Sequence, residues 1–140
     1  IPQEAANPEP VITLERTPCF GFCPVYTLTI YSDGTAVYDG QDFVDMTGEH
    51  TQIIGVQGVQ YLVNAFLDAG YMEWEDAYTN REMTDMPLAI TSLTVNGRTK
   101  RIDHYHGDSS APEALTDLED LVDATANTAQ WIGDPQSGNQ

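Results

Sequence analysis

Apolar and polar positions follow two different periods along this chain, and these periods separate strands from helices. Residues 25–31, VYTLTIY, alternate Tyr, Leu and Ile with Thr and Tyr, as a half-buried strand does. Residues 11–16 show a shorter alternation of the same kind. In residues 56–69 the apolar positions instead recur every three or four residues, which predicts an amphipathic helix. Gly70 follows it, where a C-terminal glycine cap belongs.

Two tight-turn dipeptides, Asp33-Gly34 and Asn96-Gly97, predict two β-hairpins, because both residues of each pair tolerate positive φ. The paired strands are expected at residues 25–31 and 35–38, and at 88–95 and 98–106. The two-residue loop of the second hairpin sets its register and places Ala89 opposite His104. A further short strand is expected at residues 50–54.

A second helix is predicted after the second hairpin. Ser110-Ala111-Pro112-Glu113 has the sequence of a capping box, with proline in the first turn, where its missing N–H costs nothing. The apolar stripe of this helix consists of Leu115, Leu118, Leu121, Val122 and Thr125. Trp131-Ile132 is expected to anchor its end, and the aromatic and acidic residues 71–86 are expected to form a loop over the sheet edge.

These elements predict an α+β fold. Two hairpins and flanking strands form an antiparallel sheet, and two amphipathic helices cover one face of it as a two-layer sandwich. The 140 residues suit one domain, expected at residues 11–132. Three prolines in residues 1–10 predict an extended N-terminal arm, and residues 133–140 predict a polar tail.

Charge narrows the classes of partner. The chain carries 22 acidic and five basic side chains, for a net charge of −17. Such a chain repels nucleic acid and anionic membrane surfaces. No apolar run approaches the roughly 20 residues of a transmembrane helix. Solvation of the surface is the favoured explanation of the acidity, and a saline habitat, cation binding and a basic partner stay open.

Weak calcium binding is one form that cation binding could take. The acidic side chains fall mainly on predicted turns and loops, but their spacing does not match an EF-hand. The two groups are Asp33, Asp39, Asp42 and Asp45, and Glu73, Glu75, Asp76, Glu82 and Asp85.

The only two cysteines, Cys19 and Cys23, lie in the segment TPCFGFCPVY at residues 17–26. A structural disulfide is the favoured interpretation; its small ring contributes only about 2 kcal/mol. A redox pair normally precedes a helix, whereas Pro24 leads into a strand. The third alternative is a soft-metal site for copper or zinc, formed by both cysteines and His104.

The cysteine pair also bears on localisation. Two cysteines beside aromatics and proline fit an oxidising compartment, so we expect an extracytoplasmic protein: periplasmic, cell-surface or secreted. The chain begins at Ile1 without a basic, apolar leader, as expected of a processed chain. A lipid anchor before Ile1 stays open.

Histidines and basic residues cluster on the second hairpin. His104 and His106 are two residues apart and face the same side of the strand, so they form a candidate metal pair. If that side faces the core, His104 is expected to be a half-buried, hydrogen-bonded histidine. Arg98, Lys100 and Arg101 could receive an anionic ligand or partner, but neutralising Asp103 and the 73–85 loop is the favoured role.

The cysteine segment resembles a bacterial family, domain of unknown function 6438, whose pattern is Cys-x-Gly-x-Cys-Pro-x-Tyr followed by Asp-Gly and Tyr-x-Gly. The matching residues are Thr17–Tyr26, Asp33-Gly34-Thr35 and Tyr38-Asp39-Gly40, with later matches at Thr84–Pro87, Ser92–Gly97, His104-Tyr105, Gly107, Ala111-Pro112, Leu118-Glu119 and Trp131-Ile132. The resemblance spans roughly residues 11–132. It implies an exported or lipid-anchored protein, but the family has no agreed activity or site residues.

Together these features predict an exported, non-catalytic binding or accessory module, working as a subunit or partner in a larger extracytoplasmic assembly. The sequence contains no Gly-x-Ser-x-Gly, no His-Glu-x-x-His and no phosphate loop, so we expect no enzyme and no cofactor. The expected partner is another protein that contacts the arm, the tail or the cysteine turn. The candidate partner-binding residues are Phe20, Phe22, Arg98, Lys100 and Arg101. The question this leaves is whether the two phenylalanines are buried or displayed.

Overall fold

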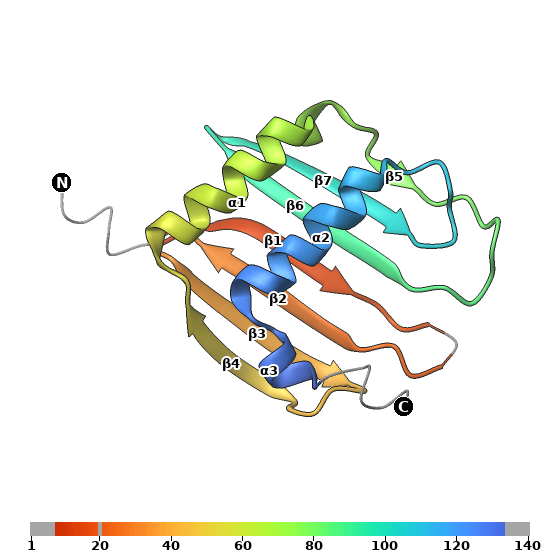
Figure 1. Ribbon diagram of the computed structural model, residues 1–140, viewed down its shortest axis with the longest axis horizontal. Coiled ribbons are helices and arrows are strands. Elements are labelled where there is room, and N and C mark those ends of the chain that lie inside the picture. The colour runs from red at the N-terminus through yellow and green to blue at the C-terminus, as the bar shows by residue number, and fades with distance from the viewer. Residues whose placement is uncertain (1–7, 20, 134–140) are drawn as a thin grey trace.

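The computed structural model describes residues 8–19 and 21–133, and it shows one sheet with helices on one face (Figure 1). The strands are β1 (Pro10–Arg16), β2 (Val25–Tyr31), β3 (Thr35–Asp42), β4 (Gly48–Ile53), β5 (Ala77–Tyr78), β6 (Leu88–Val95) and β7 (Arg98–Tyr105). The helices are α1 (Gly55–Ala69), the 3₁₀ helix η2 (Tyr71–Glu73), α2 (Glu113–Ala126) and α3 (Ala129–Ile132). The predicted α+β two-layer architecture is confirmed.

The strand order is β4-β3-β2-β1-β6-β7-β5, so β1 lies between the two predicted hairpins. Every pairing is antiparallel except that of β5 with β7. The predicted register of the second hairpin is confirmed, with Ala89 opposite His104 and Leu93 opposite Lys100. The Asn-Gly turn fixes this register, because a two-residue loop leaves no slack for a slip.

The core lies between the sheet and the helices α1 and α2. Alternate residues of β1, β2 and β6 point into this layer, as the period of two requires. Both predicted apolar stripes are largely buried against them. Fully buried members include Ile12, Leu14, Leu28, Ile30, Leu62, Phe66, Leu93, Ile102, Leu115 and Val122. The helices therefore rest on one face of the sheet, and the outward face carries mainly Thr, Ser and charged side chains with a few aliphatic ones.

The predicted capping box is wrong. Helix α2 begins after Pro112, and no side chain caps its N-terminus. The hydroxyl of Ser110 donates instead to the carboxylate of Asp108, 2.6 Å away, and its backbone N–H donates to the same group. Asp108 thus accepts the backbone N–H of Ser110 that a capping box would direct to the side chain of Glu113.

The segment predicted as a loop over the sheet edge contains two short elements. The 3₁₀ helix η2 buries Tyr71, and β5 adds a two-residue parallel strand beside β7. Strand β5 is too short, and its neighbours are too polar, to be recognised from the periodicity of apolar positions. Strand β3 also runs through Gly40 to Asp42, past the predicted end. Trp131 is buried and stacks on Tyr38, with ring centroids 4.8 Å apart, as an anchor of the chain end should.

Most of the predicted arm and tail fall outside the described residues, namely residues 1–7 and 134–140. Phe20 is also outside them. The last residues of the predicted arm are described: Pro10 already belongs to β1, and the backbone N–H of Glu9 donates to Ser32 Oγ.

Gly34 joins the first hairpin to the start of α1. Its φ is +93°, and its carbonyl accepts hydrogen bonds from the backbone N–H groups of Ile54 and Gly55. A Cβ at this position would lie 2.6 Å from Gly55 Cα and 2.8 Å from Val56 N. Glycine is therefore required both for the turn and for the close approach of the helix.

We expect Gly34→Ala to lower the free energy of unfolding by about 3 kcal/mol, because left-handed strain is added to a clash with rigid backbone. Gly97→Ala is the matched control: its φ is +78° and no atom lies within 4 Å of the added methyl group. It should cost only about 1 kcal/mol. Urea unfolding of the two variants measures the difference. Equal losses would show that the contact with α1 does not limit stability.

Candidate functional site

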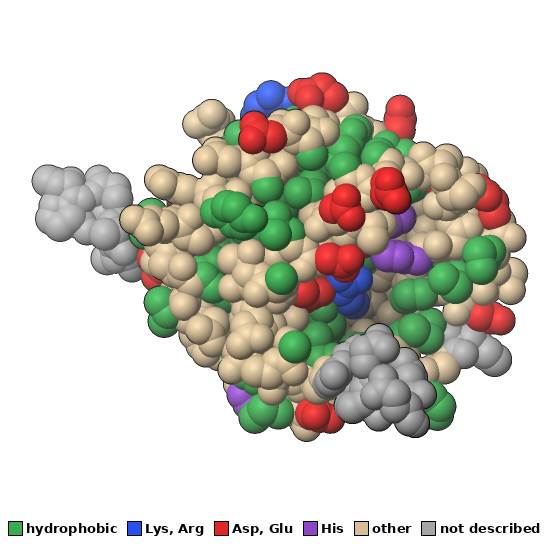
Figure 2. All heavy atoms as spheres, viewed as in Figure 1, with side chains coloured by type: hydrophobic (Ala, Val, Ile, Leu, Met, Phe, Trp, Pro, Cys, Tyr) green, Lys and Arg blue, Asp and Glu red, His purple; other side chains and the backbone are tan. Residues whose placement is uncertain are grey.

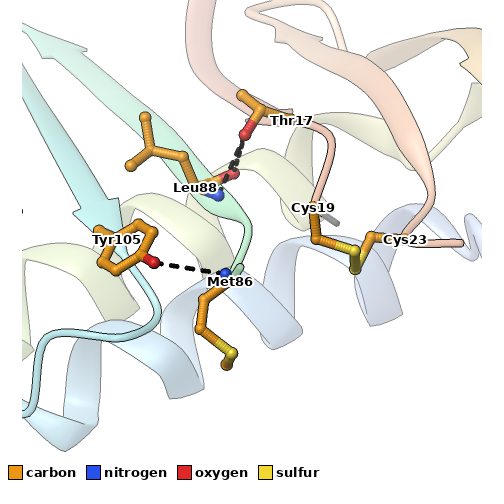
Figure 3. Close-up of a disulfide and its surroundings, with 6 residues drawn as sticks. All are labelled: Thr17, Cys19, Cys23, Met86, Leu88 and Tyr105. Atoms are coloured by element: carbon orange, nitrogen blue, oxygen red, sulfur yellow. Dashed lines mark hydrogen bonds between the residues drawn. A yellow bond between two sulfur atoms is a disulfide. The ribbon is translucent and has the colours of Figure 1, made fainter. Parts of the chain in front are cut away.

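The cysteine turn between β1 and β2 is closed by a disulfide. Cys19 and Cys23 are joined, with Cα atoms 5.6 Å apart, and Figure 3 shows the bond spanning the two limbs of the turn. Thr17 fastens the turn to the start of β6, because its N–H donates to the Leu88 carbonyl and its Oγ1 accepts from the Leu88 N–H, both at 3.0 Å. Two sulfurs in a disulfide provide no thiolate, which a soft-metal ligand or a redox nucleophile requires.

The turn displays Phe22. This side chain is 84% exposed and meets Phe43 edge to face, with ring centroids 5.3 Å apart. Phe43 is itself 45% exposed and holds a positive φ of 55° on the β3–β4 loop, where its N–H donates to Asp42 Oδ1. We call Phe22 and Phe43 the aromatic pair. The described phenylalanine of the cysteine segment is therefore displayed on the surface.

The basic residues of the second hairpin lie away from the aromatic pair. Lys100 Nζ donates to Asp76 Oδ1 at 2.7 Å and to the Trp74 carbonyl, and Arg101 Nε lies 3.2 Å from Asp103 Oδ1. Arg98 is exposed at the hairpin tip. This tip and the cysteine turn are at opposite ends of the strands (Figure 1). The structure therefore does not join these candidate residues into one surface.

A polar network under α2 connects the helix to β1 and β2. Asp123 Oδ2 accepts from Arg16 Nε at 3.1 Å and from its Nη2 at 2.7 Å, while Oδ1 accepts from the Tyr26 hydroxyl at 2.6 Å and from Thr128 at 2.8 Å. Burial raises the pKa of Tyr26, and the charge of Asp123 raises it further. Burial alone would lower the pKa of Arg16, but Tyr26 and Asp123 reverse the shift. The tyrosine thus stays a donor and the arginine stays charged.

A second network, one helical turn away, connects α2 to β7. Glu119 Oε2 lies 2.6 Å from His104 Nδ1, and Glu119 Oε1 lies 2.9 Å from His106 Nε2. The glutamate side chain is fully buried, His104 is 4% exposed and His106 is 22% exposed. The two imidazole rings stack with centroids 4.3 Å apart. His104 is thus hydrogen-bonded and more deeply buried than expected.

The carboxylate form of Glu119 is favoured by these contacts. Burial pushes its pKa upward, but the hydrogen bonds and charges of His104 and His106 outweigh burial and lower the pKa. A buried anion is thereby held by imidazole N–H donors. This cluster can bind a proton or a cation between two nitrogens and a carboxylate.

Sequence reasoning missed Glu119 and Asp123 as site residues. The signal was present, because Glu119 follows Leu115 by four positions and precedes Val122 by three, so it falls on the buried stripe of α2. Asp123 follows Glu119 by four positions. An acid on an apolar stripe needs a partner, and the opposing strands supply it.

A cavity of about 350 Å³ lies beside both networks, at the end of the sheet that carries the cysteine turn. Its walls include Cys23, Pro24, Pro87, Leu88 and Ile132. Its polar lining comes from Arg16, Tyr26, His106 and Asp123. Figure 2 shows Arg and His side chains gathered in a hollowed part of the surface beside acidic groups. The cavity thus brings Cys23 near His106, whereas His104 is not part of its lining.

Comparison with known proteins places the chain in a family without an assigned activity. A family model described as "Domain of unknown function (DUF6438)" matches residues 10–126. No curated protein matches the chain. Within the described residues, no helix has the length and apolar character needed to cross a membrane.

We expect Asp123→Ala to lower the free energy of unfolding by about 3 kcal/mol, because it strands the mostly buried Arg16 guanidinium and removes the acceptor of Tyr26. Asp120→Ala is the control. Its carboxylate lies 3.6 Å from the same guanidinium but is 72% exposed, so its loss should cost less than about 1 kcal/mol. Chemical denaturation at pH 7 measures both. Similar small losses would mean that the network does not hold α2 to the sheet.

Proposed function

Because the chain belongs to the family of domain of unknown function 6438, to which no activity is assigned, we propose from its geometry that it is an exported, non-catalytic binding module. It docks a basic partner protein on the aromatic pair at the cysteine turn. The observation that carries this proposal is the display of Phe22, 84% exposed, on a turn closed by a disulfide.

Display of the aromatic pair is costly to an isolated domain. Fully burying a phenylalanine side chain stabilises by roughly 1.5–3 kcal/mol, and Phe22 forgoes most of that. The disulfide and the Thr17–Leu88 hydrogen bonds restrict the turn that carries Phe22. Rigid aromatic side chains lose little entropy when they bind, so such a display suits a contact residue of a protein interface.

Charge points to the chemistry of the partner. No lysine or arginine occurs between Arg16 and Arg81, so the acidic residues of β3, β4 and α1 face no basic residue within those elements, and β2 carries no Asp, Glu, Lys or Arg. Asp42, the last residue of β3, and Asp45 on the β3–β4 loop are both exposed and lie on either side of Phe43 in the sequence. A basic partner would be attracted to this half of the molecule, and its apolar side chains could pack on the aromatic pair.

Export is supported by the disulfide, because such bonds persist in oxidising compartments. A periplasmic, cell-surface or secreted location fits this chemistry equally well. The soft-metal alternative formed by Cys19, Cys23 and His104 would need both sulfurs as thiolates. The disulfide pairs both sulfurs with each other, which supports the binding module over this alternative.

The test is site-specific photo-crosslinking in the native organism, with the photoreactive residue at position 22 or, as control, at position 61. Tyr61 is 57% exposed on α1, away from the cysteine turn. We expect one basic protein to be crosslinked from position 22 and not from position 61. With that protein purified, Phe22→Ala should raise the Kd at least about tenfold, and Tyr61→Ala should leave it unchanged. Equal crosslinking at both positions, or an acidic partner, would contradict the proposal.

A Cys19→Ser/Cys23→Ser double variant distinguishes the effect of the disulfide on stability from its effect on how Phe22 is presented to the partner. We expect it to unfold cooperatively with a loss of only about 2 kcal/mol, because the ring is small. Its affinity for the crosslinked partner should still fall several-fold, because the turn that carries Phe22 is no longer restrained. Unfolding in urea and titration of the partner measure the two effects. An unchanged affinity would show that the disulfide does not prepare the turn for binding.

A further inference from the structure

The cluster of His104, His106 and Glu119 has the composition of a metal site. One donor atom from each residue, two imidazole nitrogens and a carboxylate oxygen, lie within 4.8 Å of one another. His104 lies on β7, His106 directly follows that strand, and Glu119 lies on the buried side of α2. The i, i+2 spacing puts both imidazoles on the same side of the strand, and the rings are stacked.

Two contacts within the cluster are already close to the spacing that a bound metal ion requires. Zinc binds nitrogen at about 2.0–2.1 Å in tetrahedral sites, which sets neighbouring donors about 3.3 Å apart. The N···O distances, 2.6 Å to Oε2 and 2.9 Å to Oε1, would therefore open by about half an ångström. The separations among one donor atom from each residue, which do not exceed 4.8 Å, would settle near that spacing when an ion binds. With an ion bound, each imidazole would be neutral. His104 would bind the ion through Nδ1 and carry its proton on Nε2, and His106 would bind through Nε2 and carry its proton on Nδ1.

The surroundings favour a divalent cation. Glu119 supplies a negative charge inside the fold, and Asp120 and Asp123 lie on the same helix. Arg16 opposes them, but its charge is paired with Asp123 at 2.7 Å. The net charge of −17 raises the concentration of cations near the molecule. The balance of nearby charge is thus negative.

We propose that His104, His106 and Glu119 bind a divalent transition-metal ion of the zinc class. Two nitrogens and one carboxylate oxygen suit zinc and disfavour calcium, which takes six to eight oxygen ligands. His106 is the exposed member and lines the cavity that Arg16 and Cys23 also line. A fourth ligand, water or a group from a bound molecule, would reach the ion from that cavity. Three protein ligands with one open position are the arrangement of a reactive or ligand-exchanging zinc centre.

This site differs from the soft-metal set of Cys19, Cys23 and His104 considered from the sequence. It adds Glu119 to the candidate pair of His104 and His106, and it requires no thiolate. It does not depend on the proposed docking of a protein on the aromatic pair, because its residues lie under α2 and not on the cysteine turn. The alternative is a purely structural cluster, in which the hydrogen bonds of Glu119 to His104 and His106 only fix α2 on the sheet.

The test is calorimetric titration of the metal-stripped protein, disulfide intact, with ZnCl₂ at pH 7.5 in a buffer that does not chelate zinc. We expect one equivalent of zinc to bind with micromolar or tighter affinity. The titration is done in 5 mM CaCl₂, about a thousandfold excess over the protein, so that calcium occupies any acidic sites on the surface. Bound Co²⁺ should give the visible absorption of a four-coordinate ion, and its band should shift when imidazole enters the open position.

His106→Gln removes a partly exposed ligand, and His50→Gln is its matched control. His50 is the remaining histidine; it lies on β4, where its Nε2 meets the Thr47 carbonyl. We expect His106→Gln to weaken zinc binding about 100-fold or more, since even outer-shell partners are worth 10–100-fold, and His50→Gln to leave it unchanged. Circular dichroism of both variants establishes that they are folded.

Zinc should also raise the Tm of the wild-type protein and of His50→Gln, but not that of His106→Gln, because binding to the native state alone stabilises it. Absence of one-equivalent binding to the wild-type protein would overturn the proposal. So would equal weakening by His106→Gln and His50→Gln, or displacement of zinc by the calcium excess. Each of these outcomes would mean that the cluster is only a structural set of hydrogen bonds.

Discussion

The fold depends on two carboxylates that point inward from α2. Glu119 and Asp123 are one helical turn apart, and together they reach β7, β1 and β2. A buried carboxylate costs several kcal/mol unless its oxygens are hydrogen-bonded and its charge is compensated. Both acids meet this condition, and no buried side-chain N or O atom in the described part of the chain lacks a hydrogen-bond partner. The helix is therefore held in one axial position and one rotation on the sheet.

An apolar stripe alone would hold α2 less specifically. Leucine and valine contacts are non-directional, so a helix resting only on them can shift along the sheet at little cost. Each carboxylate instead accepts two or more directional hydrogen bonds. A slide of one residue would leave these oxygens buried without donors. The same contacts place His106 and Arg16 at the wall of one cavity.

The sequence revealed much of the sheet because its signals are local. Alternation in β2, the Asn-Gly turn and the stripe of α1 each depend on residues close in sequence, and they lead to the correct strands, register and helix. The capping box failed because Asp108 competes for Ser110, which a four-residue motif cannot show. Strand β5 was not predicted because two residues are too few to show an alternation of apolar and polar positions.

The site was harder to predict because it depends on contacts between distant segments. His104 could be assigned a face, but its partner Glu119 lies 15 positions later on another element. Arg16 and Asp123 are 107 positions apart. Such pairs are determined by how α2 lies on the sheet, which no local pattern contains. The useful sequence signal was an acid on an apolar stripe, since it demands a buried donor without identifying which one.

Histidines, and not the few basic residues of the chain, serve Glu119. Of five lysines and arginines, Arg16 is used by Asp123, Lys100 by Asp76 and Arg101 by Asp103. A histidine can donate a hydrogen bond in either protonation state, so His104 and His106 satisfy the buried carboxylate without a lysine or arginine. A lysine there would neutralise the carboxylate permanently. The two imidazoles satisfy both oxygens of Glu119, and the same three groups supply the nitrogen and oxygen donors of the proposed metal site.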